Sequence, residues 1–243
     1  MKKLMIAALM CLTVAAASAQ DFRIGAKGAF NSTWLFNNNI SDQGNVVDYA
    51  STFGASFGLS SQLYFNENLG VLLDILYSSN NQNLEGEILD EHYESTTKVK
   101  YLDLPLLLRI SSEGGAYVEF GPQFSLLMGA KEDLAFDHPL PTDYTDRDVK
   151  DYFNGFGIAP ILGFGVDISA SDNLLINIGL RFGYGVSDAT VKRTEAELDA
   201  LTDDQHSFYG DLAHTNADNE YSYQKTNRAF GGFTLGIIYK PNN

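Results

Sequence analysis

Long stretches of this chain alternate between apolar and polar residues, and this pattern limits the folds that the chain can adopt. In residues 53–65 the odd positions are mostly apolar and the even positions are small or polar. Neighbouring side chains of a β-strand point to opposite faces, so each such stretch predicts a strand with one apolar and one polar face. We predict eight strands of about 10 to 16 residues, over residues 22–34, 53–65, 69–77, 102–110, 118–128, 156–168, 174–184 and 228–240.

The predicted strands are too long for an ordinary soluble sheet. Soluble strands usually have about five or six residues, whereas a tilted strand needs about 9 to 11 residues to cross a bilayer. Tight turns alternate with long polar loops: the turns lie at residues 66–68, 111–115 and 169–173, and the loops at residues 37–52, 84–97, 131–152 and 188–226. Outer-membrane barrels alternate short periplasmic turns with long extracellular loops, with both termini in the periplasm. The sequence therefore predicts an all-β fold, an eight-stranded antiparallel up-and-down transmembrane β-barrel in the outer membrane.

The charged residues inside the strands fall on the polar face. Whether a residue has an odd or even number within its strand, which we call its parity, decides its face. By this rule the polar face carries Lys27, Asp74, Asp103, Arg109, Glu119, Asp167 and Arg181. A charge that faces lipid at the bilayer midplane costs up to about 2 to 4 kcal/mol, so this distribution favours a polar face that lines the lumen. The alternative is a soluble lipocalin-like barrel with its apolar face inward, against which the strand lengths and the alternation of turns and loops argue.

Aromatic residues on the apolar face collect toward the strand ends. Interfacial aromatic girdles have this distribution, because amphipathic rings prefer the level of the lipid headgroups. We interpret seven residues as interfacial aromatics, with Phe22, Phe65 and Tyr239 toward the periplasm and Trp34, Phe53, Tyr77 and Tyr184 toward the outside.

The N-terminus has the pattern of a secretory signal peptide. A short basic start precedes an apolar run at residues 4–16 and the small residues of positions 17–19, which fits cleavage after residue 19. A membrane anchor is the alternative, but about 13 apolar residues are fewer than the ~20 of a spanning helix. We predict a signal peptide over residues 1–19 and an outer-membrane β-barrel domain over residues 20–243.

Cysteine content and charge exclude several kinds of chemistry. Cys11, the only cysteine, lies in the predicted signal peptide, so the mature barrel has neither a disulfide nor a thiolate metal site. The chain has 31 acidic and 16 basic residues and a formal net charge of -15. This charge argues against a nucleic-acid partner, because phosphate contacts need a basic face. We expect a monomer in contact with outer-membrane lipid and lipopolysaccharide.

Several segments resemble a known family. Residues 100–109 and 117–122 look like the paired-strand signature of the PorT-like outer-membrane β-barrel family of Bacteroidetes, and residues 155–167 and 180–185 resemble its later strands. The resemblance covers essentially the whole mature chain and implies the barrel architecture. Most members of that family have no assigned function, so the resemblance leaves the activity open.

An eight-stranded barrel is just filled by its own side chains, so we expect no pore that conducts solutes. Charges that are shut off from water must be paired. We predict a structural network in which two arginines bridge four carboxylates, with a proton or ion relay as the alternative. Its members are Asp74, Asp103, Arg109, Glu119, Asp167 and Arg181.

The histidines all fall in the predicted loops, at His92, His138, His206 and His214. A hydrolase at the barrel rim needs a histidine there as its general base. No nucleophile lies at a diagnostic spacing from any of them.

The two longest loops are acidic. Residues 131–152 and 188–226 carry seven and nine acidic residues, which form a solvated surface or bind cations, although they match no EF-hand loop. Thr194 and Glu197 have the spacing of a capping box ahead of Leu198, which indicates a short helix over the barrel mouth, with a frayed loop as the alternative.

These observations predict an outer-membrane barrel with a side-chain-filled lumen. It would anchor acidic extracellular loops for structural or surface-interaction roles, with a surface protein or secretion machinery as partner. Two alternatives stay open, namely small-ligand binding or transport through a widened barrel, and a hydrolase at the rim. We predict no enzymatic activity and assign no catalytic, cofactor-binding or metal-binding residue.

Overall fold

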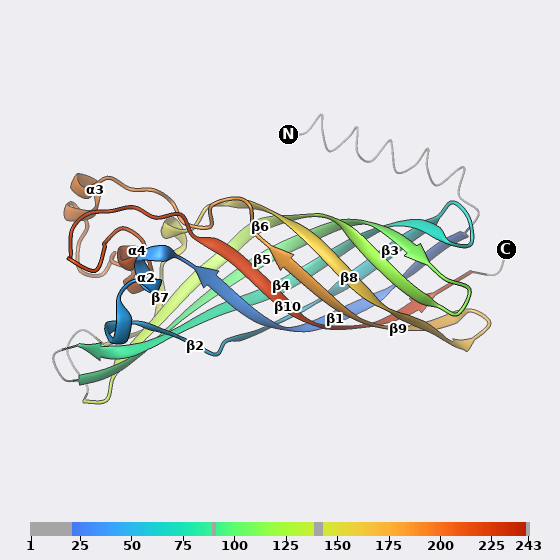
Figure 1. The fold of residues 1–243 in the computed structure, drawn as a ribbon, viewed down its shortest axis with the longest axis horizontal. Coiled ribbons are helices and arrows are strands. Elements are labelled where there is room, and N and C mark those ends of the chain that lie inside the picture. Colours follow the sequence, from blue (N-terminus) through green and yellow to red (C-terminus); the bar gives the residue numbers. More distant parts are fainter. Residues whose placement is uncertain (1–20, 89–90, 139–142, 242–243) are drawn as a thin grey trace.

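A closed ring of antiparallel strands forms the body of the molecule (Figure 1). The computed structural model describes residues 21–88, 91–138 and 143–241, so the predicted signal peptide lies outside the described residues. Neighbouring ring strands pair along the chain, and the last pairs with the first, which confirms the predicted up-and-down barrel. The ring consists of β1 (Asp21–Phe36), β3 (Phe53–Tyr64), β4 (Leu69–Ile88), β5 (Glu91–Ser111), β6 (Ala116–Phe136), β8 (Phe156–Ser171), β9 (Leu174–Tyr184) and β10 (Asn227–Tyr239).

Short elements gather at one end of the ring. Figure 1 shows them opposite the end where β1 begins and β10 ends; we call these the loop end and the turn end. Strand β2 (Asp48–Ala50) pairs with β4, and β7 (Tyr144–Asp148) pairs with β6. Among the described residues, no helix is long and apolar enough to cross a membrane. The helical elements are α2 (Asn38–Ser41), η1 (Gly44–Val46), η2 (Lys150–Tyr152), α3 (Glu195–Asp199) and α4 (Phe208–Leu212).

The outer surface of the ring is an apolar belt. Along each ring strand, buried inward residues alternate with outward residues, as the pleat of a strand requires. The outward residues of the belt are large and apolar, so their exposure is explained by contact with lipid. Examples from all eight strands are Phe30, Leu59, Ile75, Leu106, Phe120, Leu162, Ile178 and Leu235.

Two of the four predicted loops contain long extensions of the ring strands. Residues 84–97, predicted as a polar loop, belong mostly to a hairpin, because β4 continues to Ile88 and β5 begins at Glu91. Residues 131–152 also begin as strand, because β6 continues to Phe136 and then pairs with β7. The outward positions of these extensions carry polar residues, apart from Ala135, so they lack the large apolar face that marks the lipid-facing strands. The sheet therefore projects beyond the belt at the loop end.

A β-bulge in β6 lies where the belt ends. Tyr101 of β5 is opposite Leu127, and Lys100 is opposite Gly129, so Met128 is an extra residue on β6. One extra residue exchanges the inward and outward positions of a strand. Odd positions of β6 are buried before the bulge and even positions after it.

Loops and short helices close the loop end over an apolar cluster. Leu35, Tyr93 and Leu134 of the ring strands pack with Ile40 of α2 and Tyr209 of α4, and all five are buried. Full burial of one large apolar side chain contributes roughly 1.5 to 3 kcal/mol. Residues 37–50 and 188–226 therefore form a packed structure, which we call the cap.

Helix α3 in the cap has the predicted capping box. The Thr194 hydroxyl accepts from the Glu197 backbone N–H at 3.3 Å, and the Glu197 carboxylate accepts from the Thr194 backbone N–H at 2.7 Å. The prediction of a short helix at this point is confirmed.

Leu106→Arg should block assembly of the barrel. Leu106 is exposed in the belt, where a charge costs up to about 2 to 4 kcal/mol. Glu94→Arg is the matched control, because Glu94 is exposed on the same face of β5 but lies beyond the belt; it should fold like the parent. Heat-modifiable gel mobility measures folding, and equal loss in both variants would contradict the position of the belt.

Candidate functional site: charged side chains in the lumen

Arg109 is the centre of a group of charged side chains that face into the ring. Its Nη2 donates to Glu119 Oε2 at 2.7 Å, and its Nη1 donates to Asp167 Oδ2 at 3.1 Å. Arg109 and Glu119 are directly opposite each other on β5 and β6. The guanidinium carbon of Arg109 also lies 3.7 Å from the ring centroid of Tyr117. Two carboxylates and an aromatic face therefore compensate this buried cation.

Arg181 of β9 extends the group across the lumen. Its Nε donates to Glu119 Oε1 at 2.8 Å, and its Nη1 donates to Asp74 Oδ2 at 2.8 Å. Asp74 accepts in addition from Lys27 Nζ at 3.2 Å. Glu119 thus bridges two arginines, and Asp74 bridges an arginine and a lysine. These bonds connect strands that are not neighbours in the ring.

A separate ion pair lies nearer the loop end. Arg228 Nη2 is 3.2 Å from Asp103 Oδ1, which also accepts from the Ser125 hydroxyl. The prediction that Arg109 or Arg181 bridges Asp103 is therefore wrong. Arg228 was missed because it is the second residue of its strand, where the alternation is hardest to assign. The sequence pattern could have identified Arg228, because its even position puts it on the same face of β10 as the buried Thr234.

The charges of these ion-paired side chains balance. Four cations and four carboxylates give a formal charge of zero, and none of these side chains is more than 9% exposed. Buried charges are tolerated only when they are paired. The structure thus brings together the predicted residues with two more cations. We call the set the lumenal charge network; it comprises Lys27, Asp74, Asp103, Arg109, Glu119, Asp167, Arg181 and Arg228.

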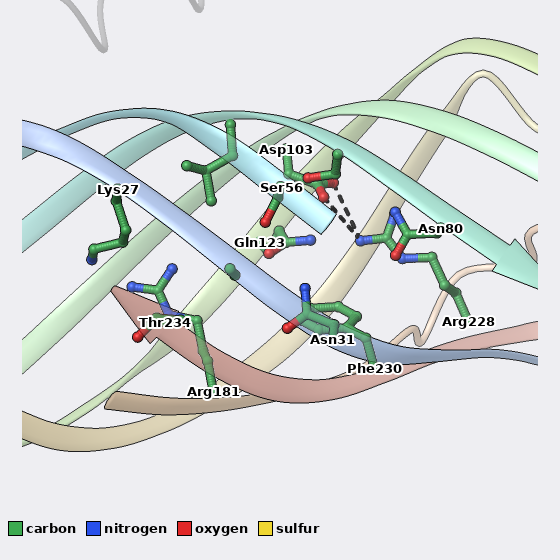
Figure 2. A pocket seen from close by; sticks show the side chains of 13 residues that line it. Lys27, Asn31, Ser56, Asn80, Asp103, Gln123, Arg181, Arg228, Phe230 and Thr234 are labelled. Atoms are coloured by element: carbon green, nitrogen blue, oxygen red, sulfur yellow. Dashed lines mark hydrogen bonds and ion pairs between the residues drawn. The ribbon is translucent and has the colours of Figure 1, made fainter. Parts of the chain in front are cut away.

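A small polar cavity separates the two parts of the network. Figure 2 shows Lys27 and Arg181 on one side of it and Asn80 and Arg228 on the other. Its volume of ≈ 20 Å³ holds only about one or two water molecules. Asn80 Nδ2 and Ser78 Oγ are buried here without a hydrogen-bond partner among the described residues, so ordered water is their expected partner.

At the turn end the lumen opens into a vestibule of ≈ 780 Å³. Tyr64, Asp167 and the ion pair of Asp21 with Arg23 line it. Asp167 keeps 9% of its side chain exposed, whereas Arg109, its partner, is fully buried. Solvent from the turn end therefore reaches the edge of the network and stops there.

A buried carboxylate on β6 holds the cap on the ring. Glu132 accepts from the backbone N–H groups of Phe208 and Tyr209 in α4, at 2.7 and 3.0 Å, and from the hydroxyls of Thr97 and Tyr144, at 3.0 and 2.8 Å. Burial raises the pKa of the Glu132 carboxyl group, and the described residues include no cation paired with it. The sequence analysis put Glu132 in a solvated acidic loop. Its role was missed because the bulge in β6 turns this residue inward.

The four histidines do not form a common site. His92 lies in β5, His138 is exposed, and His206 and His214 lie on either side of α4. His206 Nδ1 is 2.9 Å from the Asp211 carboxylate. In the described part of the chain, none of the four is hydrogen-bonded to a serine or threonine hydroxyl. No group of three or more His, Cys, Asp or Glu side chains within these residues could hold a metal ion.

The residues interpreted as interfacial aromatics lie at both ends of the belt. Trp34 is partly buried and stacks on Phe36, with ring centroids 5.8 Å apart. The other six side chains are exposed, with Phe22, Phe65 and Tyr239 toward the turn end and Phe53, Tyr77 and Tyr184 toward the loop end.

A closed ring with an apolar outer belt and a charge-balanced interior defines a membrane-spanning β-barrel. Residues 18–191 match the family described as outer membrane protein beta-barrel domain. This match covers most of the chain, which therefore belongs to that family. The protein is an outer-membrane β-barrel, with its turn end in the periplasm and its loop end outside the cell. No curated protein matches the sequence.

Solved outer-membrane barrels are similar to this chain at low sequence identity. Neisserial surface protein A has 13% identity and a TM-score of 0.41, over 90% of this chain and 97% of that one. Ail of Yersinia pestis has 10% identity and a TM-score of 0.40, over 91% and 100%. The outer membrane protease OmpT of Escherichia coli has 8% identity and a TM-score of 0.36, over 92% and 98%.

Arg109→Met should destabilise the barrel by about 3 to 5 kcal/mol, because it leaves Glu119 and Asp167 buried without this partner. Arg193→Met in the cap is the control and should cost no more than about 1 kcal/mol, as expected for a partly exposed cation. Urea unfolding in lipid vesicles, read by the fluorescence of Trp34, measures both. An unchanged midpoint for Arg109→Met would show that the network is not structural.

Glu132→Ala should release α4 from the ring while the ring stays folded. The substitution leaves the buried N–H of Tyr209 without an acceptor, at a cost of about 1 to 3 kcal/mol, and leaves the N–H of Phe208 with only a 3.4 Å contact to the Tyr144 hydroxyl. Hydrogen exchange should speed up in residues 207–213 and stay slow in β5 and β6. Glu94→Ala, which removes an exposed carboxylate, should change neither region. Unchanged exchange of α4 in Glu132→Ala would contradict the anchoring role.

The same contact should depend on pH. The folded state raises the pKa of Glu132, so the attachment of the cap is strongest below the ordinary glutamate pKa and weakens as the pH rises through the raised value. Exchange of the α4 amides, corrected for the intrinsic pH dependence, should therefore increase over this range in the parent protein. Glu132→Gln should abolish the increase, and an increase that persists in this variant would assign it to another group.

Proposed function

We propose that this barrel is a closed membrane anchor that holds a folded, acidic cap at the cell surface for structural or surface-interaction roles. The lumenal charge network carries this proposal. Its side chains come from seven strands, are nearly fully buried and sum to zero charge. The cavity between its two parts has a volume of only ≈ 20 Å³. A lumen filled in this way supports a structural function and argues against transport.

The cap supports a role in surface interactions. Its apolar cluster and the contacts of Glu132 fix it to the ring, so its outer surface is presented in one arrangement. That surface and the adjoining β7 segment carry exposed carboxylates such as Asp146, Asp148, Asp203 and Asp204. Opposite charge speeds and orients protein association. We therefore propose a partner with a basic face, either a surface protein or a component of secretion machinery, and a monomeric barrel.

Membership of the PorT-like branch is part of the same proposal. Its support is the resemblance of residues 100–109 and 117–122 to the paired-strand signature of that branch. These residues include Arg109 and Glu119, which form an ion pair between neighbouring strands. We also propose that the protein is not an enzyme, since His206 and the other histidines have no hydroxyl nucleophile bonded to them among the described residues.

Conductance in planar bilayers tests the closed lumen. The parent protein should give no stable channel, because the network and the cap fill the passage. The variant Arg109→Ala/Glu119→Ala removes two interior side chains and should increase ion leakage if it folds, which heat-modifiable mobility checks. Stable, size-selective conductance of the parent protein would instead favour transport through a widened barrel.

A further inference from the structure

Four lysines gather on the outer surface of the barrel at the loop end of the belt. Lys98 and Lys100 point outward from β5, Lys131 points outward from β6, and Lys150 is exposed in η2. Lys98 and Lys131 are directly opposite each other in register. We call these four residues the lysine patch.

Lys150 joins the patch through the backbone. The N–H of Val149 donates to the carbonyl of Ala130 at 3.1 Å, which brings η2 against β6 just beyond the bulge. Lys100 lies opposite Gly129, the neighbour of Ala130. A side chain added at Gly129 would meet no atom within 4 Å, so the surface between Lys100 and Lys150 is open.

The lysine patch begins where lipid contact ends. On β5 the outward residues from Ile110 to Leu102 are apolar, and the next outward residue is Lys100. On β6 the last large apolar residue of the belt is Met128 at the bulge, and Lys131 is the next charged residue that points outward. The ammonium groups therefore lie at the level of the headgroups of the outer leaflet.

Carboxylates neutralise only part of the patch. Lys98 forms an ion pair with Asp133, and Asp146 lies 3.8 Å from Lys98 and 3.7 Å from Lys131. In the described part of the chain, Lys100 and Lys150 have no carboxylate within 4.0 Å. The ammonium groups of Lys100 and Lys150 are therefore uncompensated, whereas carboxylates hold those of Lys98 and Lys131 in place.

The concentration of lysine here contrasts with the charge of the protein. The chain has a formal net charge of -15, and the cap next to the patch is acidic. Snorkelling alone explains a single lysine at an interface, but it gives no reason for three on two adjoining strands and a fourth in the neighbouring η2. Clusters of basic residues beside a membrane span are typical of sites for anionic lipid headgroups.

We propose that the lysine patch binds the phosphate groups of lipid A in the lipopolysaccharide of the outer leaflet. Those phosphates lie just above the acyl chains that contact the belt, at the height of Lys100 and Lys150. The ammonium groups supply the charge and the hydrogen-bond donors that phosphate oxygens need. This site is independent of the lumen and of any partner of the cap.

Binding of lipid A to the full barrel in detergent, followed by native mass spectrometry, tests the site. The probes are diphosphorylated lipid A and the same lipid without its phosphates. The variant Lys100→Gln/Lys150→Gln should bind the diphosphorylated probe about thirtyfold more weakly, because each lysine near an anionic surface contributes about 1 kcal/mol and 1.4 kcal/mol corresponds to a factor of ten. The control Lys192→Gln/Lys225→Gln, which changes two cap lysines, should bind like the parent.

Three results would overturn the proposal. They are equal binding of both probes by the parent protein, unchanged affinity of Lys100→Gln/Lys150→Gln, and displacement of lipid A by excess inorganic phosphate, which would indicate a site for free anions. Retained binding by Lys100→Arg/Lys150→Arg would support it, because this variant keeps the charge. All substitutions are at exposed positions, and heat-modifiable mobility verifies that each variant is folded.

Discussion

Charges enclosed in the lumen must neutralise one another, and much of this structure follows from that requirement. A membrane-spanning sheet has to close on itself, because lipid offers no partner for an unpaired backbone edge. Closure with eight strands leaves an interior just wide enough for side chains. The outward positions are taken by apolar residues, so polar and charged residues occupy the inward ones. Once enclosed, Arg109 and Arg181 need carboxylates within hydrogen-bond distance, and Glu119 serves both.

The same requirement ties together strands that are far apart around the ring. Backbone hydrogen bonds join only neighbouring strands, whereas Arg181 of β9 reaches Asp74 of β4 across the lumen. These contacts resist changes in the cross-section of the barrel, which supports the closed lumen that we propose. The excess negative charge of the chain is therefore displayed outside the lumen, mainly on the cap and loops. Among the buried carboxylates that the structure describes, Glu132 is the exception, since backbone N–H groups and hydroxyls compensate it instead of a cation.

The sequence predicted the ring and much of its interior, because period two is a local signal. Parity alone put Arg109 and Glu119 on the inward face, and the short connection between their strands made them neighbours. The partner of Asp103 could not be predicted in this way. It depends on which strands face each other across the lumen, and no single strand encodes that arrangement.

The missed residues have equally specific causes. Arg228 lies at the start of a strand, where too few residues precede it to establish parity. Glu132 follows a bulge that reverses parity, so counting from the preceding strand puts it on the wrong face. The hairpin over residues 84–97 was predicted as a loop because it extends beyond the lipid, where its outward residues are polar. A strand with polar residues on its outward face lacks the signal that identified the others.

A double-mutant cycle between Arg181 and Asp74 tests most directly whether the lumenal charge network holds the barrel together. The free energies of unfolding of the parent protein, Arg181→Met, Asp74→Asn and the double variant would be measured in lipid vesicles. If the pair bridges the lumen as a structural contact, its coupling energy should exceed about 1.5 kcal/mol. Additive effects, with a coupling energy near zero, would contradict the account.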